Sequence, residues 1–420
     1  MQKDRYIFAL IIYGVVLLTA ATVCSFVLPK DVFAVANTGT MSGQQEHSGV
    51  TGTSPTPIVP SNAVTQQLPA PTDTAKNPGQ SESEEEAEVL KVDPWELLSV
   101  ETTQEWRTAI GTRCIVLPKP EAAIAEQEIV FSLSDMPMER SIALEFQGCA
   151  EINYDYATFE RIADGQYFDT EPIEDSADPL KEIKQRCTLL EDGSYQVYME
   201  LLLDKTYVYN VYEAESYYFI SLTDAKDAYD RIVVLDAGHG GWDTGTASYD
   251  GQYLEKDINL QVMQYLEELL RQEDIKVYTT RTTDRNVGHT ERIRLANDLG
   301  ADMFISIHCN NVYQNPDAHG TEVLYTQYQD SWTGMNSKKL AQICLEELLA
   351  EVQLSNRGLF ARGDDLTVLQ QAEVPATIVE LALMSNVDDM ALLKKEETQR
   401  SAAKALYQAI LRGYEESGKE

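Results

Sequence analysis

The chain has 420 residues, of which 43% are hydrophobic and 24% charged, and its formal net charge is −35. This length exceeds what one hydrophobic core usually organises, so we expect two folded domains and additional non-globular segments. So large a negative charge is repelled by phosphate backbones and by anionic membrane surfaces, which argues against nucleic acid as a partner. We interpret the acidity as a source of solubility, and we expect a monomer.

The N-terminal region contains an uncharged apolar stretch, Tyr6–Leu28, that is long enough to cross a bilayer as a helix. Lys3 and Arg5 precede it, so the positive-inside tendency places residues 1–5 in the cytoplasm and the rest of the chain outside. A cleavable signal is the alternative, because Ala34-Val35-Ala36 resembles a small-residue cleavage site. The length of the stretch favours a retained transmembrane helix. We therefore expect a single-pass protein of the cell membrane, or a secreted protein if the segment is cleaved.

Residues 29–94 are rich in Ser, Thr, Pro, Gly and Gln and predict a disordered linker, because they offer too little apolar surface to fold. From residue 95 to 228, short aromatic and β-branched runs alternate with period two, as in Ser141–Phe146 and Tyr195–Leu201. The pair Asp192-Gly193 is typical of a tight hairpin. We expect a small all-β domain of the sandwich type in this region.

The six cysteines lie far apart and form no CxxC pair. The sequence allows one disulfide between two of Cys114, Cys149 and Cys187. We favour the alternative that these residues are isolated buried thiols. Cys309 follows a histidine on an expected strand, where neighbouring side chains point to opposite faces, so we expect Cys309 to pack in the core.

Strands and helices alternate between residues 229 and 420, which predicts an α/β domain with a mainly parallel sheet flanked by helices. The first buried strand is expected at Ile232–Leu235. Further strands are expected at 276–279, 303–308, 321–325 and 376–381, and helices at about 255–272 and 337–351 and after Thr290, Asp388 and Glu397.

Three potential metal ligands lie where strands end or helices begin. His239 follows the first strand in a glycine-rich turn, His308 ends a later strand, and Glu255 opens the first long helix. Reactive groups collect at the carboxyl ends of strands in open α/β sheets. Two histidines and one carboxylate suit zinc with a fourth position left to water. Glu380, at the end of the strand Ala376–Val379, is the expected acid and base beside the ion.

Each of these residues also has a structural interpretation when it is taken alone. Either histidine could be a satisfied structural residue, and Glu255 could be a helix-start acid that complements the helix dipole. The combination of motifs in order is more specific, because the chain resembles the zinc-dependent N-acetylmuramoyl-L-alanine amidases of the His-Glu-His class, the amidase type 3 family. The motifs are DAGHGGWDTG at 236–245, EKDINL at 255–260, TRTTD at 280–284, RIRLAN at 292–297, SIHCN at 306–310 and ELALMSN at 380–386.

The resemblance implies a site and a substrate. It implies that His239, Glu255 and His308 hold Zn²⁺, while Glu380 is the catalytic acid/base. The substrate would be peptidoglycan, cut at the amide between the lactyl group of N-acetylmuramic acid and the L-alanine of the stem peptide. The enzyme would then act outside the cytoplasm, and the β-rich domain would target or space it.

Two further residues, Asn310 and His319, are candidates for lining the cleft. Some members of the family carry an inhibitory helix after the second histidine motif, and the connection from Asn311 to Thr321 is too short to contain it. Two alternatives to the amidase remain, namely another zinc peptidase acting on stem peptides and a catalytically silent wall-binding protein. Arg281 and Arg292 are expected to tie loops to helices instead of contacting substrate.

Overall fold

The computed structural model of the protein describes residues 66–67, 113–125, 127–152, 160–163, 166–168, 179–213, 217–329 and 332–419. Within these ranges, no helix combines the length and the apolar character that crossing a bilayer requires. The expected transmembrane stretch Tyr6–Leu28 and nearly all of the expected linker at 29–94 lie outside the described residues.

Two β-sheets form the first described region. One is antiparallel with the order β3-β4-β8-β7, and the other has the order β1-β9-β10-β2-β5-β6. Their strands are β1 Gln66–Gln67, β2 Cys114–Pro118, β3 Val130–Met136, β4 Ser141–Cys149, β5 Glu160–Ala163, β6 Gln166–Phe168, β7 Leu180–Leu189, β8 Tyr195–Leu203, β9 Val208–Glu213 and β10 Tyr217–Thr223. Ile115 and Ile220 of one sheet share a core with Leu144 and Val197 of the other. This packing is a β-sandwich, the arrangement that the alternating pattern predicts.

The cysteines of the described residues are all free thiols. Cys114 and Cys149 are buried, and Cys187 is half-buried. Burial raises the pKa of the Cys114 thiol far above its ordinary value, which makes it inert. The prediction of isolated buried thiols is therefore confirmed for Cys114 and Cys149, whereas Cys187 is a free thiol that is only half-buried. Cys309 is also buried, in the core of the second region, as expected from its place on a strand.

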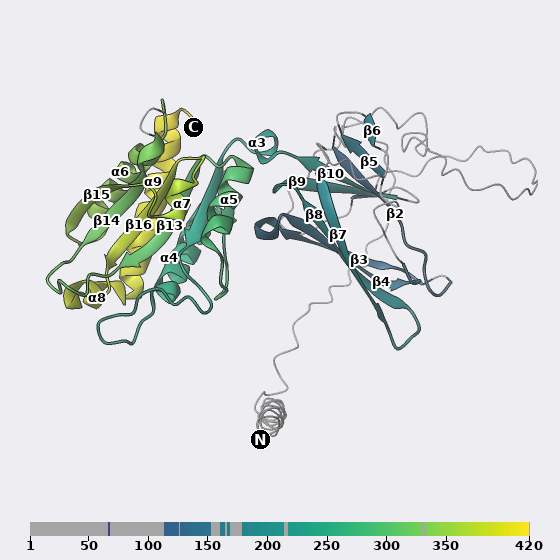
Figure 1. The fold of residues 1–420 in the computed structure, drawn as a ribbon, viewed down its shortest axis with the longest axis horizontal. Coiled ribbons are helices and arrows are strands. Elements are labelled where there is room, and N and C mark those ends of the chain that lie inside the picture. Colours follow the sequence, from purple (N-terminus) through teal and green to yellow (C-terminus); the bar gives the residue numbers. More distant parts are fainter. Residues whose placement is uncertain are drawn as a thin grey trace, which may run out of the picture. The chain divides into compact units, whose positions relative to one another are not determined.

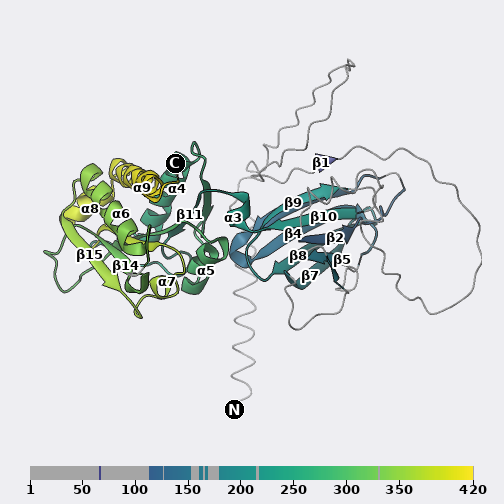
Figure 2. The ribbon, with the colours of Figure 1, turned by 90° about the horizontal axis from the view of Figure 1, so that it is seen from above.

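The second region is an α/β domain in which helices flank one sheet (Figures 1 and 2). The strand order of this sheet is β12-β11-β13-β16-β14-β15. Its strands are β11 Ile232–Ala237, β12 Lys276–Thr279, β13 Met303–Asn310, β14 Thr321–Thr326, β15 Asn356–Arg362 and β16 Ala376–Leu383. The helices from Ala225 onward are α3 Ala225–Ala228, α4 Glu255–Leu270, α5 His289–Leu299, α6 Ser337–Glu351, α7 Thr367–Gln370, α8 Val387–Leu393 and α9 Glu396–Ser417. The mainly parallel sheet flanked by helices is confirmed.

Two strands run against the other four. β12, β11, β13 and β16 are parallel, whereas β14 pairs antiparallel with β16, and β15 follows β14. The cause is the connection 311–320, which contains no helix. Without a crossover helix, the chain turns at the edge where β13 ends and returns antiparallel. The amino ends of β14 and β15 therefore lie at the same edge as the carboxyl ends of β11, β13 and β16.

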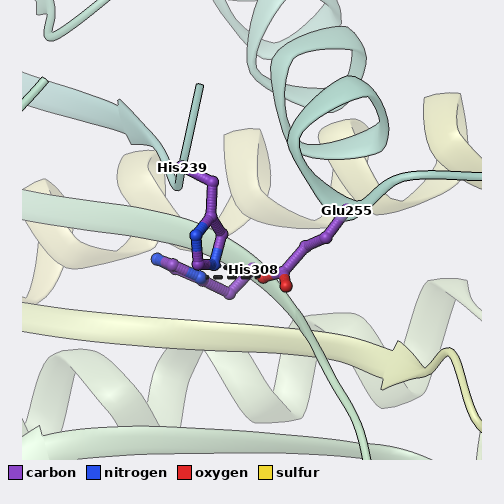
Figure 3. Close-up of side chains that lie close together, drawn as sticks. All are labelled: His239, Glu255 and His308. Atoms are coloured by element: carbon purple, nitrogen blue, oxygen red, sulfur yellow. Dashed lines mark hydrogen bonds and ion pairs between the residues drawn. The ribbon is translucent and has the colours of Figure 1, made fainter. Parts of the chain in front are cut away.

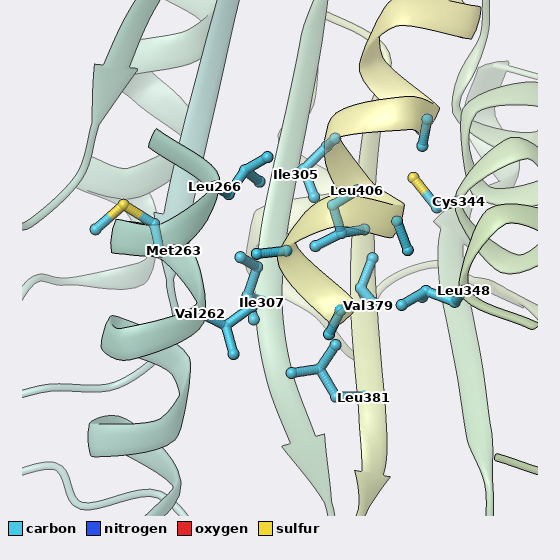
Figure 4. Packing of buried hydrophobic residues seen from close by; sticks show 14 of the residues in the cluster. Val262, Met263, Leu266, Ile305, Ile307, Cys344, Leu348, Val379, Leu381 and Leu406 are labelled. Carbon is cyan, nitrogen blue, oxygen red and sulfur yellow. The ribbon is translucent and has the colours of Figure 1, made fainter. Parts of the chain in front are cut away.

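The sheet has a hydrophobic core on each face, because alternate residues of a buried strand point to opposite sides. On one face, Ile305 and Ile307 of β13 pack with Val262 and Leu266 of α4 and with Leu406 of α9 (Figure 4). On the other face, residues of β11, β13 and β16 pack with residues of α5 and α7. Burial on both sides explains why these strands read as continuous apolar runs.

A buried carboxylate, Asp236 at the end of β11, joins three elements. Arg292 Nη1 and Thr280 Oγ1 donate to its Oδ1 at 2.6 and 2.5 Å, and Ser306 Oγ donates to its Oδ2 at 2.6 Å. Burial alone would raise the pKa of Asp236, but the Arg292 charge and the two hydroxyl donors hold it below its ordinary value. Asp236 therefore fixes α5 and the ends of two strands to the strand that precedes His239.

Replacing Asp236 by asparagine should destabilise the fold by about 3–5 kcal/mol at pH 7, because Arg292 is left buried without a counter-charge. The folded-state pKa is lowered, so the stabilisation by Asp236 is present above the ordinary value of 3.8 and is lost as the pH falls below it. Urea unfolding of Asp236→Asn and the parent at pH 7 and pH 3 measures the difference. Asp274→Asn, at a fully exposed position, is the control. A difference of equal size at both pH values would contradict this account.

Candidate functional site

His239 follows β11 in a turn with an unusual backbone. Its φ is 61°, and Gly240 and Gly241 have φ values of 134° and 61°. Glycine adopts a positive φ easily, but histidine does so only at a cost in free energy. Such backbone strain is typical of functional sites, where the position of the side chain matters. The surrounding structure therefore has to fix this turn.

Two buried arginines hold the carbonyl groups of the turn. Arg281 donates from Nε to Ala237 O at 2.8 Å and from Nη2 to Gly238 O at 3.0 Å. Arg292 donates from Nη2 to His239 O at 2.8 Å. These contacts offset the strain of the turn and confirm that both arginines have a structural role.

The three expected ligands converge, although each comes from a different element. Figure 3 shows the imidazoles of His239 and His308 beside the carboxylate of Glu255. His239 Nε2 lies 3.1 Å from Glu255 Oε1, and His308 Nδ1 lies 2.9 Å from the same oxygen. One potential ligand atom of each residue lies within 4.8 Å of the others. This donor set, two imidazoles and one carboxylate, fits a zinc-like divalent cation.

Two of the three ligands, His239 and Glu255, are oriented by further contacts. His239 Nδ1 lies 2.9 Å from Asp243 Oδ2, which leaves Nε2 turned towards Glu255. The backbone amides of Thr246 and Cys309 donate to Glu255 Oε2 and Oε1 at 2.8 and 3.1 Å. Such contacts fix the ring orientation and the carboxylate geometry that metal binding requires.

The electrostatics of the group favour a cation. Burial lowers the pKa of His239, but the hydrogen bonds and charges of Glu255 and Asp243 outweigh it and raise the pKa to about 9. Burial works to raise the pKa of Glu255, yet hydrogen bonds from the two histidines lower it far below the ordinary carboxyl value. Glu255 is therefore an ionised, buried carboxylate that requires positive charge beside it.

Glu380 lies next to this group on the neighbouring strand. It is the register partner of His308 across β13 and β16. Its Oε2 atom is buried and has no hydrogen-bond partner. Burial raises the pKa of Glu380 to about 7, with charges of Glu255 and Glu322 adding to this effect and His308 opposing it. An unpartnered carboxyl oxygen with such a pKa is suited to accepting and returning a proton near neutral pH.

Two residues on the reversed strands, Glu322 and Arg357, belong to none of the sequence motifs but lie at the same edge of the sheet. Glu322 of β14 is the register partner of Glu380, and it accepts hydrogen bonds from Arg357 Nε at 2.7 Å and from Asn310 Nδ2 at 2.6 Å. The signal that could have revealed Glu322 is the short 311–320 connection, because it returns β14 to the edge where β13 ends. Arg357 follows from the same geometry, since β15 pairs with β14.

The two expected cleft residues lie at the same edge but outside the group of three. Asn310 is half-buried, and its amide is engaged by Glu322 and by the backbone N–H of Asn311, which donates to Asn310 Oδ1 at 2.6 Å. His319 is exposed, and its Nδ1 lies 2.8 Å from Asp317 O in its own loop. The loop between these two residues contains no helix, which agrees with the expectation that the inhibitory helix is missing there.

At one edge of an open α/β sheet, the structure brings together two imidazoles, a buried carboxylate and a second carboxyl group with an unpartnered oxygen. This arrangement is typical of metal-dependent hydrolases. The sequence profile described as N-acetylmuramoyl-L-alanine amidase (Amidase_3) matches residues 233–412. The uncharacterised protein YqiI of Bacillus subtilis is 34% identical over 180 residues, which cover 43% of this chain and 83% of YqiI.

Two further relatives have amidase names. The germination-specific N-acetylmuramoyl-L-alanine amidase of Bacillus subtilis is 27% identical over 202 residues, covering 45% of this chain and 81% of that protein. The probable cell wall amidase LytH of Staphylococcus aureus is 35% identical over 168 residues, covering 40% of this chain and 52% of LytH.

Solved structures of amidases also match. The catalytic domain of CwlV from Bacillus (Paenibacillus) polymyxa var. colistinus is 27% identical, with 44% of this chain and 99% of that chain covered and a TM-score of 0.41. The N-acetylmuramoyl-L-alanine amidase of Clostridium difficile 630 is 32% identical, with 44% and 97% covered and a TM-score of 0.41.

The chain belongs to the N-acetylmuramoyl-L-alanine amidase family, through its α/β domain. It is accordingly an enzyme that cleaves the N-acetylmuramoyl-L-alanine amide of peptidoglycan. The resemblance inferred from the motifs is confirmed.

Replacing Gly238 by alanine should disturb the site without disturbing the fold. A Cβ atom at Gly238 would overlap the imidazole of His308, which would have to move away from Glu255. We expect metal affinity to fall by about 10- to 100-fold, measured by titration with Zn²⁺. Gly363→Ala is the control, because its φ lies outside the positive region and its added Cβ would meet only the side-chain ends of Gln327 and Tyr328. Unchanged affinity in Gly238→Ala would show that His308 is not held where metal binding needs it.

Proposed function

We propose that the α/β domain is a zinc amidase in which His239, Glu255 and His308 hold the ion and Glu380 is the catalytic acid and base. The observation that carries this proposal is the convergence of two imidazoles on one buried carboxylate oxygen, at 3.1 and 2.9 Å. Nitrogen and carboxylate ligands in this number favour Zn²⁺ over Mg²⁺ or Ca²⁺, which prefer oxygen ligands.

In this mechanism, a bound Zn²⁺ supplies Lewis-acid activation of the scissile carbonyl and of the attacking water. Asp243 keeps the His239 ring in the orientation that turns Nε2 inwards. Glu380 Oε2 accepts the proton of the attacking water and delivers it to the nitrogen of L-alanine as the amide bond breaks. Because this oxygen is buried and otherwise unpartnered, no competing donor has to be displaced first.

We further propose that the enzyme acts outside the cytoplasm as a monomer that is anchored by the helix expected at Tyr6–Leu28. The support is the length of this uncharged stretch and the basic residues Lys3 and Arg5 before it. An anchored head on the linker expected at 29–94 would reach wall material close to the membrane. Peptidoglycan is the substrate class that such a location offers.

Removal of the ion should abolish activity reversibly. A chelator is expected to stop the release of intact stem peptides from peptidoglycan, and Zn²⁺ should restore it, whereas Mg²⁺ should not. Zn²⁺ should also raise the thermal unfolding temperature of the parent but not of Glu255→Gln, because a ligand that binds only the folded state stabilises it. Full activity in metal-free protein would contradict the proposal, and cleavage within the stem peptide would instead identify a peptidase.

Replacing Glu380 by glutamine should separate chemistry from metal binding. The variant should bind one equivalent of Zn²⁺ as the parent does, while kcat falls by about 10²- to 10⁴-fold because the proton carrier is lost. Mass analysis of digested peptidoglycan, together with metal content, measures both effects. Glu373→Gln, an exposed carboxylate before β16, is the matched control. Parent-like kcat in Glu380→Gln would remove Glu380 from the mechanism.

A further inference from the structure

Exposed aromatic side chains gather on loops around the metal-binding group. Trp242, Tyr249, Tyr253 and Tyr313 are 83%, 51%, 36% and 73% exposed. Single exposed apolar residues need no explanation, but a group of them beside a reactive site marks a binding surface. Trp242 is the most exposed of these, and its indole contributes little to the folded core.

The turn that carries Trp242 is held firmly. Gly240 N donates to Asp243 O at 2.8 Å, and Asp243 N donates to Gly240 O at 3.2 Å. Gly241 N donates to Asp284 Oδ1 at 2.7 Å, and Lys256 Nζ donates to Gly241 O at 3.0 Å. A rigid backbone therefore presents a solvent-exposed aromatic ring, and such a pre-organised ring loses little conformational entropy when it binds a ligand.

Trp242 lies on one side of the site and the tyrosines on the other. The turn of Trp242 contacts Asp284, which follows β12, the edge strand next to β11. By contrast, Tyr249 N donates to Met384 O, which follows β16, and the Tyr313 hydroxyl lies 3.2 Å from Thr246 Oγ1. In the sheet order, β13 and β16 lie on the opposite side of β11 from β12. A substrate that spans the metal group therefore reaches Trp242 with one end only.

We propose that Trp242 is a stacking platform for a sugar ring of the glycan strand, placed directly beside the metal group. This inference rests on the proposed function, in which the scissile amide has a sugar on its acyl side and a peptide on its amine side. The C–H face of a pyranose packs against an aromatic ring through dispersion and the hydrophobic effect. The sugar thereby lies on the β12 side of the site, and the stem peptide leaves towards β16.

The polar neighbours of the indole fit a sugar better than a stem peptide. Asp243 follows Trp242 in the chain, and Asp284 accepts a hydrogen bond from the backbone amide of Gly241 on its other side; their side chains are 30% and 49% exposed. Carboxylates accept hydrogen bonds from sugar hydroxyl and acetamido groups, whereas the carboxylates of a stem peptide would need a cation as their partner. Lys256, the cation beside the turn, is already paired with Asp284 at 2.6 Å. The peptide-bearing end of the substrate is therefore disfavoured on this side.

The test measures glycan binding apart from hydrolysis. The probe is a peptide-free tetrasaccharide of alternating N-acetylglucosamine and N-acetylmuramic acid, titrated by calorimetry into the zinc-supplemented full chain. Trp242→Ala should raise the Kd by about two- to twelvefold, the effect that the loss of one aromatic stacking contact is expected to have. Trp242→Phe should retain most of the affinity. On peptidoglycan, Trp242→Ala should raise KM with little change in kcat, because stacking is equal in the ground and transition states.

The control is Trp332→Ala. Trp332 is also exposed, but it follows the carboxyl end of β14 and thus lies at the opposite edge of the sheet. It should leave both tetrasaccharide affinity and KM unchanged.

Three results would overturn the platform. The first is that Trp242→Ala binds the tetrasaccharide as tightly as the parent does. The second is that the variant instead loses affinity for a sugar-free stem peptide. The third is that its zinc content falls, which would trace the effect to the His239 turn. If the parent itself released no stem peptides from peptidoglycan, the amidase proposal would fail. The tetrasaccharide titration would still show whether Trp242 binds a sugar ring, because it does not depend on hydrolysis.

Discussion

The site depends on one buried carboxylate, Glu255 at the start of α4. Its Oε1 atom is within hydrogen-bond distance of both histidines, and backbone amides hold both of its oxygens. A charge this well buried is stable only beside positive charge. A divalent cation held by the three ligands would supply this charge. It would thereby link the first turn of α4 to the loop after β11 and to the end of β13.

Much of this arrangement could be predicted from the sequence. The apolar runs of β11, β13 and β16 mark buried strands, and His239, His308 and Glu380 follow from their places at the ends of these strands. Glu255 is recognisable because it opens an amphipathic helix. Periodicity predicts that these residues lie at strand ends and at the start of a helix, whereas their roles follow from the combination of motifs that the chain shares with the amidase family.

Strand direction could not be predicted in the same way. The residue pattern predicts a strand at 321–325, but the reversal of this strand depends on where the 311–320 loop returns, and no pattern predicts β15. The burial pattern of β15 is mostly intermediate, because an edge strand lacks the continuous apolar run of a central strand. Glu322 and Arg357 come to this edge through the pairing of β14 and β15, so the length of the 311–320 connection indicates their place but no motif around either residue does. The exposed Trp242 is similar, since solvent exposure is a property of the folded turn.

The short link between β13 and β14 also bears on how the enzyme is controlled. Residues 311–320 include no helix that has to swing aside before a polymer reaches Glu255, so this link imposes no opening step on turnover. Regulation of this peptidoglycan hydrolase therefore does not act through a helix in the 311–320 connection.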